Sequence, residues 1–437
     1  MKILMFSWEF PPLISGGLAM ACYGMVKSLL KLGIEIDLVL PTKEMIYFPF
    51  KNPDDVDTLP VVFLDPIKQK TFNQTIFETI EEKLEYIGVN KIPETYLSPQ
   101  EVQTWKEIIT ISHIQEKHIT TTEERVLINL KKYLSGDENL FKKVQEMATR
   151  AEHFAEKLNF DVIHAHDWLT YPAGIIAKRI SKKTLISHMH ATEFDRAGGY
   201  GDDRIHNIEH DGLTYSDKVI CVSKYTANMI ISRYCVDSGK IIIVHNAYDI
   251  GIIPEKKQRI FKKPTVLFLG RITLQKGPDY FVEVADRVLR LNPDARFIMA
   301  GSGDMSRKLL HKTASLRLKN RFIFAGFLNR KQVEEILNSV DIYVLPSVSE
   351  PFGIAPLEAM AYGVTAIISK QSGVSEVVEN AYKIDFWDIN EMTNVIDYLI
   401  KNPDICNKVG NAGKQEVFHI GWDEVSEKIL AIYNELT

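Results

Sequence analysis

The segment that decides the fold of this chain reads Ser349-Glu350-Pro351-Phe352-Gly353-Ile354-Ala355-Pro356-Leu357-Glu358, and it follows the apolar run 342–345. A short apolar run, a Gly/Pro loop and a helical pattern in this order predict a strand, a connecting loop and a helix. The first backbone N–H groups of a helix have no partner within the helix, so they attract an anion such as a diphosphate. In this segment those groups would belong to Gly353, Ile354 and Ala355.

The same segment carries two carboxylates. Glu358, just inside the predicted helix, can accept hydrogen bonds from two neighbouring hydroxyls of a ribose, and Glu350 would then lie where a sugar would be. Arg271 and Lys276 follow a second apolar run, 266–269, and supply two cations beyond another predicted strand end. Open α/β sheets bind ligands beyond their strand ends, so we interpret the two loops as one nucleoside-diphosphate site that needs no metal.

Strand and helix patterns alternate twice along the chain. In the first half, the apolar run 3–6 leads through Gly16-Gly17 into a helical pattern at about 19–32 and then into the run 36–40, which predicts a βαβ unit. The second half repeats this scheme. A chain of 437 residues is too long for one ordinary core. We therefore expect an α/β protein with two parallel-sheet domains that face a cleft.

Composition narrows the class of protein. Hydrophobic residues make up 45% and charged residues 25% of the chain, as in globular enzymes, and the formal net charge of −5 gives no electrostatic case for a nucleic-acid partner. The four cysteines include no C-x2-C pair, so neither a disulfide framework nor a cysteine zinc site is expected. The N-terminus is typical of a strand and not of a signal peptide. We expect a cytoplasmic enzyme without membrane contact.

The C-terminal motifs resemble those of retaining glycosyltransferases with the two-Rossmann GT-B architecture. Glu350 and Glu358, with seven residues between them, are similar to the E-x7-E element of that family. Arg271 and Lys276 are similar to its Arg/Lys pair, which stabilises the departing nucleoside diphosphate. The resemblance implies retention by front-face attack, in which the leaving phosphate accepts the proton of the acceptor.

Three N-terminal segments, 7–12, 16–18 and 164–168, are similar to segments of glycogen and starch synthases. In 188–190, His190 is the better match to the active-site histidine of those enzymes and would hydrogen-bond the sugar. Besides His190, Arg271, Lys276 and Glu350 as catalytic residues, the resemblance implies donor contacts at Gly16, Gly17, Asp167, Gly353, Ile354, Ala355 and Glu358, and acceptor contacts at Glu9 and Trp168.

The resemblance also suggests a division of the chain. Residues 1–250 would form the acceptor-side Rossmann-like domain and residues 255–421 the nucleotide-sugar domain, with the C-terminal helix 422–437 packed back on the first domain. Residues 43–150 fit neither pattern and are interpreted as a helical insertion. Two roles stay open for it: a cap on the acceptor side of the cleft, or a helical layer with a structural role alone.

The leading functional hypothesis is a glycogen synthase-like hexosyltransferase that moves glucose from ADP- or UDP-glucose to an α-glucan without a cofactor. Two departures qualify it: Ile14 and Met20 stand where glycogen and starch synthases carry a lysine and an aspartate. Transfer to a lipid, a cell-envelope polysaccharide or a small molecule is therefore the alternative. A nucleotide-sugar epimerase and a binding protein without activity are weaker hypotheses, and the sequence leaves the oligomeric state open.

Three patterns suggest metal ligands, and we interpret each without a metal. His164 and His166 share one strand face, as do His188 and His190, which is typical of zinc ligands and equally of a polar cleft wall. His206-Asn207-Ile208-Glu209-His210 matches H-x-x-E-H, but it is interpreted as a solvated helix face. Asp55-Val56-Asp57, a D-x-D pattern, is interpreted as a polar loop.

Overall fold

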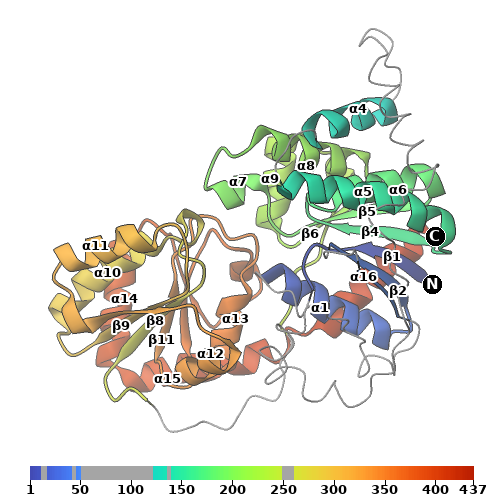
Figure 1. Ribbon diagram of the computed structural model, residues 1–437. Helices are drawn as coiled ribbons and strands as arrows, with labels where there is room; N and C mark the ends of the chain where they lie inside the picture. Colours follow the sequence, from blue (N-terminus) through green and yellow to red (C-terminus); the bar gives the residue numbers. More distant parts are fainter. Residues whose placement is uncertain (11–16, 42–45, 51–121, 135–138, 249–259) are drawn as a thin grey trace, which may run out of the picture.

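The structure is a computed structural model that describes residues 1–10, 17–41, 46–50, 122–134, 139–248 and 260–437 (Figure 1). It contains two α/β domains, each built on one mainly parallel sheet, as the alternating pattern predicts. Gly16 and the D-x-D pattern at 55–57, both singled out in the sequence, lie outside the described residues, as does the chain at 249–259. No described helix combines the length and the apolar character that crossing a membrane would require.

The first domain contains a seven-stranded sheet in the order β3-β2-β1-β4-β5-β6-β7. Every neighbouring pair is parallel except β2 and β3, which run antiparallel at one edge. Pro49 in β3 fits this place, because proline is tolerated in an edge strand. The strands are β1 (Lys2–Phe6), β2 (Glu35–Leu40), β3 (Ile46–Phe50), β4 (Val162–His166), β5 (Thr184–Met189), β6 (Lys218–Cys221) and β7 (Ile241–Ile243).

Helices cover both faces of this sheet, because successive residues of a strand point to opposite sides. In β1, Ile3 and Met5 belong to the core shared with α1 and α16, whereas Leu4 and Phe6 belong to the core shared with α4, α5, α6, α8 and α9. The helices are α1 (Gly17–Lys31), α4 (Thr122–Leu134), α5 (Asn139–Lys157), α6 (Tyr171–Ser181), α7 (Glu193–Ala197), α8 (Asp203–Tyr215) and α9 (Lys224–Tyr234), with the 3₁₀ turn η4 (Ser238–Lys240).

The described end of the expected insertion, residues 122–134 and 139–150, contributes to this second core. Leu127 and Leu130 of α4 and Val144 and Met147 of α5 are buried there. This part of the segment is a structural helical layer. The acceptor cap, the other role left open for residues 43–150, rests on residues 51–121, which lie outside the described chain.

The second domain contains a six-stranded, all-parallel sheet in the order β10-β9-β8-β11-β12-β13. The order reverses between β8 and β11, and their following loops flank the crevice where such sheets bind ligands. The strands are β8 (Thr265–Leu269), β9 (Arg296–Ala300), β10 (Phe322–Gly326), β11 (Ile342–Leu345), β12 (Thr365–Ser369) and β13 (Tyr382–Ile384). The helices are α10 (Pro278–Leu291), α11 (Ser306–Ser315), α12 (Arg330–Leu337), α13 (Ile354–Ala361), α14 (Ile389–Lys401) and α15 (Pro403–Val417), with the 3₁₀ turns η5 (Leu274–Lys276), η6 (Lys319–Arg321) and η7 (Gly373–Glu376).

The last helix, α16 (Trp422–Leu436), returns to the first domain and lies beside α1 (Figure 1). The indole of Trp422 packs directly on Gly24 of α1, because a Cβ atom at that glycine would fall 2.1 Å from the indole nitrogen. Near the other end of α16, the Tyr433 hydroxyl lies 2.5 Å from Nδ1 of His164 on β4. The C-terminal helix thus closes the face of the first sheet that carries α1.

We predict that Gly24→Ala destabilises the fold. The added methyl group would overlap the rigid indole of Trp422, and overpacking of this kind costs about 1–3 kcal/mol. The free energy of unfolding from denaturant titration would measure the loss. Gly421→Ala is the matched control, because a Cβ atom there meets nothing within 4 Å. Equal stability of the two variants would contradict the tight α1–α16 contact.

Candidate active site

A positive φ angle at Gly353 shapes the loop between β11 and α13. Gly353 caps the helix with φ +100°, a conformation that residues with a Cβ atom rarely adopt. A Cβ atom at this position would also approach Cγ of Glu350 to 3.1 Å. The glycine therefore lets the loop fold back, so that the side chain of Glu350 lies against Gly353, the residue that caps α13.

Glu350 is fixed by its backbone as well as its side chain. Its N–H donates to the carbonyl of Gln371 at 3.0 Å, and its carbonyl accepts from the N–H of Gly373 at 2.9 Å. Its carboxylate, 5% exposed, accepts from Nζ of Lys276 at the end of η5 and from the hydroxyl of Ser347 at 3.3 Å. Lys276 and Glu350 thus form a nearly buried ion pair that joins the β8 and β11 loops.

Arg271, unlike Lys276, is an exposed cation. Its Nη2 lies 3.4 Å from the amide oxygen of Gln275, which is buried. Within the described part of the chain, no carboxylate forms an ion pair with Arg271. The charge of Arg271 is therefore available to an anion, whereas that of Lys276 is shared with Glu350.

Arg330 is a site residue that sequence reasoning missed. It begins α12, and its Nη1 donates to Oε1 of Glu358 on α13 at 2.8 Å. Burial raises the pKa of Glu358, and the Arg330 guanidinium acts in the opposite direction. The capping box Asn329–Gln332 does mark a helix start in the sequence. Nothing local, however, shows that this helix start meets Glu358.

On the other side of the cleft, Asp167 positions His190. Asp167 has the left-handed φ of 58°, and its buried carboxylate accepts from the backbone N–H of His190 at 2.7 Å and of Ala191 at 3.4 Å. Burial raises the pKa of Asp167 to about 6, while Arg196 and the two N–H groups act in the opposite direction. The backbone that carries His190 is therefore held by a carboxylate directly beyond β4.

His164, His166, His188 and His190 form a stack that we call the histidine wall, with neighbouring ring centroids 4.3–5.3 Å apart. Its origin is the pairing of β4 with β5, which places His166 opposite His188. Burial lowers the pKa of His164 and His190 to about 3 and that of the other two well below the usual value, so the imidazoles are neutral.

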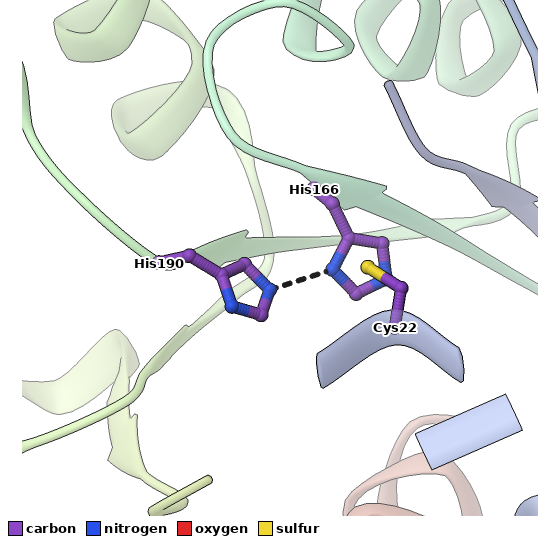
Figure 2. Close-up of side chains that lie close together, drawn as sticks. All are labelled: Cys22, His166 and His190. Atoms are coloured by element: carbon purple, nitrogen blue, oxygen red, sulfur yellow. Dashed lines mark hydrogen bonds between the residues drawn. The ribbon is translucent and has the colours of Figure 1, made fainter. Parts of the chain in front are cut away.

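One hydrogen bond of the wall leaves polar atoms without partners. Nε2 of His190 lies 2.9 Å from Nδ1 of His166 (Figure 2). Nδ1 of His190 and Nε2 of His166 are buried and have no hydrogen-bond partner among the described residues. Two neutral imidazoles that share one hydrogen bond keep one lone pair and one N–H on these outer nitrogens, whichever tautomers are present. Each unmet group costs about 1–3 kcal/mol, which a bound ligand can offset.

A buried ionic network supports the same backbone. Nη1 of Arg196 donates to the carbonyl of Ala191 at 2.6 Å, and its Nη2 pairs with the carboxylate of Glu209. Glu209 has no exposed surface and also accepts from the N–H of Glu193 at 3.0 Å and from the hydroxyl of Tyr234. The interpretation of 206–210 as a solvated helix face is therefore wrong for Glu209. Arg196 lies only six residues after His190, so the sequence could have suggested that it supports this segment. Nothing in the sequence indicated that its partner is Glu209.

The remaining predicted residues are placed as follows. A Cβ atom at Gly17 would lie 3.9 Å from Cδ1 of Ile354, so the first turns of α1 and α13 lie next to each other. Glu9 lies close enough to Asp167 to raise the pKa of that carboxyl.

Trp168 is 4% exposed and packs against Phe141, which indicates a core role and leaves acceptor contact a prediction. Ala355 lies in the first turn of α13, and Gly16 lies outside the described residues.

Hydrogen bonds between the domains fix one wall relative to the other. The hydroxyl of Ser349, next to Glu350, donates to Asp195 and accepts from the hydroxyl of Tyr225 at 3.0 Å. The carboxylate of Glu376 on η7 accepts from the N–H groups of Lys224 and Tyr225 at 2.8 and 2.9 Å, at the start of α9. The Glu350 loop and the His190 segment therefore belong to one connected arrangement.

Two sheets, a helix N-terminus with adjacent cations and an opposing polar wall define the GT-B class of nucleotide-sugar-dependent transferase. Family comparison agrees with this assignment. The starch synthase catalytic domain matches residues 2–240, and the glycosyl transferases group 1 family matches residues 249–416. The chain belongs to these families and is a retaining GT-B glycosyltransferase.

Individual relatives are distant but span the chain. An uncharacterized glycosyltransferase of Methanocaldococcus jannaschii is 26% identical, with 99% of this chain and 98% of that protein covered. A glycogen synthase of Mycobacterium tuberculosis is 23% identical, with 99% and 94% covered. Among solved structures, Anabaena HepE in complex with UDP and glucose superposes with a TM-score of 0.64 at 16% identity, and both chains are fully covered. The last likeness concerns the fold alone.

The pKa of Asp167 predicts an acid limit to activity. As pH falls through about 6, the carboxylate takes up a proton and its hold on the His190 and Ala191 N–H groups weakens. We expect kcat/KM for the nucleotide-sugar donor to fall roughly tenfold per pH unit below that value. In Asp167→Asn this limb should be absent and activity lower throughout.

Asp161→Asn is the control for this pH profile, because Asp161 accepts from the N–H of Lys2 at the opposite end of the sheet. That variant should keep the acid limb. An unchanged limb in Asp167→Asn would show that another group causes it.

Proposed function

We propose that the protein transfers glucose from ADP- or UDP-glucose to an α-glucan, with retention of the anomeric configuration. The observation that supports the proposal is that Arg271, Lys276, Glu350 and Glu358 lie on the loops and helix starts of the second domain, where Ser349 beside Glu350 is hydrogen-bonded to Asp195 of the segment that follows His190. Such a set matches a ligand that is anionic at one end and carries hydroxyl groups at the other.

The chemistry follows from where charge develops. Breaking the anomeric C–O bond builds positive charge on the sugar and negative charge on the leaving diphosphate. Arg271, which forms no ion pair within the described chain, and Lys276 would stabilise the leaving group, together with the first N–H groups of α13. Lys276 would shift part of its interaction from Glu350 to the phosphate as this charge grows. The gain is largest in the transition state, which is where it accelerates the reaction.

The two carboxylates would orient the donor. Glu350, fixed by backbone and ion pair, would accept from sugar hydroxyls. Glu358 would accept from the ribose, and Arg330 favours the ionised form that can accept from two hydroxyls. His190 would contact the sugar through Nδ1, the buried nitrogen without a partner among the described residues. With the leaving phosphate as base, the mechanism needs no protein nucleophile and no metal.

A second acceptor class has its own support. Ile14 and Met20 remove polar groups that glycogen and starch synthases place near the donor. Transfer to a lipid, a cell-envelope polysaccharide or a small molecule uses the same donor wall and differs only on the acceptor side.

The experiment is a nucleoside-diphosphate release assay with UDP-glucose and ADP-glucose, each with and without glycogen. We expect release that depends on glycogen with one of the donors. Release that is independent of any acceptor would contradict transfer to a glucan and favour hydrolysis or epimerisation. No release from either donor would contradict glucose as the sugar.

In the same assay, Lys276→Ala should lower kcat by roughly 10²–10³-fold, the usual effect of removing a leaving-group stabiliser. Because the substitution leaves Glu350 without its ion-pair partner, Lys276→Gln, which keeps a hydrogen-bond donor, and thermal unfolding are measured beside it. Lys312→Ala is the matched control: Lys312 pairs with Glu283 on the surface, and its loss should leave kcat unchanged. Full activity of folded Lys276→Ala would contradict the role of Lys276.

A further inference from the structure

Cys22, His166 and His190 come together at one end of the histidine wall (Figure 2). They belong to three elements: Cys22 to α1, His166 to the end of β4, and His190 to the segment after β5. One donor atom from each residue lies within 4.8 Å of those of the other two. Two of these side chains belong to the histidine wall, and the thiol faces them from the neighbouring helix.

We propose that Cys22, His166 and His190 form an inhibitory site for a borderline-soft divalent cation of the zinc type. A thiolate with two imidazoles is a donor set that such ions prefer, and three protein ligands leave a fourth position for water. Bonds of about 2.0–2.1 Å to nitrogen and about 2.3 Å to sulfur place tetrahedral ligand atoms roughly 3.3–3.7 Å apart. The ring nitrogens of His166 and His190, now 2.9 Å apart, need to separate by only a few tenths of an ångström.

An ion at this point would leave both imidazoles neutral. The hydrogen bond between His166 and His190 leaves a buried lone pair and a buried N–H without partners among the described residues. An ion that replaces this hydrogen bond moves the shared ring proton to an outer nitrogen, so the two imidazoles release none. The Cys22 thiol, which accepts from the hydroxyl of Ser7 at 3.3 Å, releases one proton when sulfur binds the ion.

The positive charge of a bound ion would be balanced by nearby carboxylates. A divalent ion with one thiolate leaves a net charge of +1 at the site. Asp167 and Glu9 both lie close enough to Cys22 to act electrostatically on its thiol. Their carboxylates would offset the remaining charge without binding the ion, and Asp167 would also hold the backbone of His190 in place.

A deeper trio, His164, His166 and His188, also brings ligand atoms together, but it consists of imidazoles alone. Nδ1 of His164 contacts the Tyr433 hydroxyl at 2.5 Å, and its Nε2 contacts Nδ1 of His188 at 3.2 Å. An ion there would displace a partner of His164 and gain no thiolate. The Cys22 site supplies a thiolate, so it is favoured.

Binding of the ion requires only the geometry, whereas inhibition rests on the proposed function of His190. An ion on Nε2 of His190 leaves a proton on Nδ1, so the nitrogen proposed to contact the sugar could donate a hydrogen bond but no longer accept one. The ion should therefore weaken binding of the nucleotide-sugar donor and compete with it. The reaction itself stays metal-independent. A chelator such as EDTA should therefore leave activity unchanged or raise it.

Binding is tested with Co²⁺ as a spectroscopic substitute for zinc, on the full chain with Cys235→Ser, because Cys235 is an exposed thiol. We expect one ion per chain, tetrahedral d–d bands and a thiolate-to-cobalt charge-transfer band. Cys22→Ser should lose the charge-transfer band. Cys406→Ser, which removes a buried cysteine of the other domain, should keep it.

A missing charge-transfer band, or one that survives Cys22→Ser, would overturn the proposal. Bands of d–d type alone, unchanged by His190→Gln, would place the ion on the deeper trio and also overturn it.

In kinetics, Zn²⁺ should inhibit competitively with the donor, and Cys22→Ser should require at least about tenfold more Zn²⁺ for the same inhibition. Binding without this inhibition would overturn the inhibitory role. The spectra decide the site even if neither glucose donor proves to be a substrate.

Discussion

The arrangement of the cleft depends on the ion pair between Lys276 and Glu350. Because Glu350 is nearly buried, its charge requires a partner, and Lys276 provides one from the loop after β8. The pair joins the two loops at the point where the strand order reverses. The neighbouring Ser349 then connects this loop to Asp195 of the first domain. The ion pair thus holds the β8 and β11 loops together, and the hydrogen bond of Ser349 attaches them to the first domain.

In the first domain, too, buried carboxylates paired with a cation hold the site residues in place, and here more groups take part. Asp167 and Glu209 are buried carboxylates, and burial raises the pKa of Asp167 to about 6 and of Glu209 to about 7. Arg196 favours the ionised form of both and binds the carbonyl of Ala191. The backbone on both sides of Ala191 is therefore fixed by charged groups from β4, α7 and α8. Rigid placement of His190 is what a hydrogen bond to a sugar requires.

The histidine wall connects the site to the end of the chain. Neutral imidazoles continue from His190 at the cleft to His164, which contacts Tyr433 of α16. The same helix packs Trp422 on Gly24 of α1, the helix that also carries Cys22. A helix that follows the second domain in sequence thus completes the core beneath the site of the first.

The sequence alone determined the two parallel-sheet domains and the motif that contains Glu350, Gly353 and Glu358, because strand–loop–helix patterns and a glycine at a helix start are local properties. Only the tertiary structure decided the partners of those residues. Arg330 reaches Glu358 across 28 residues, and Glu209 reaches Arg196 from a helix whose pattern indicated a solvated face. Likewise, the alternating pattern of the four histidines gave no sign that Cys22 of α1 lies beside two of them. Contacts of this kind depend on how helices pack on the sheet, and local patterns carry no information about that packing.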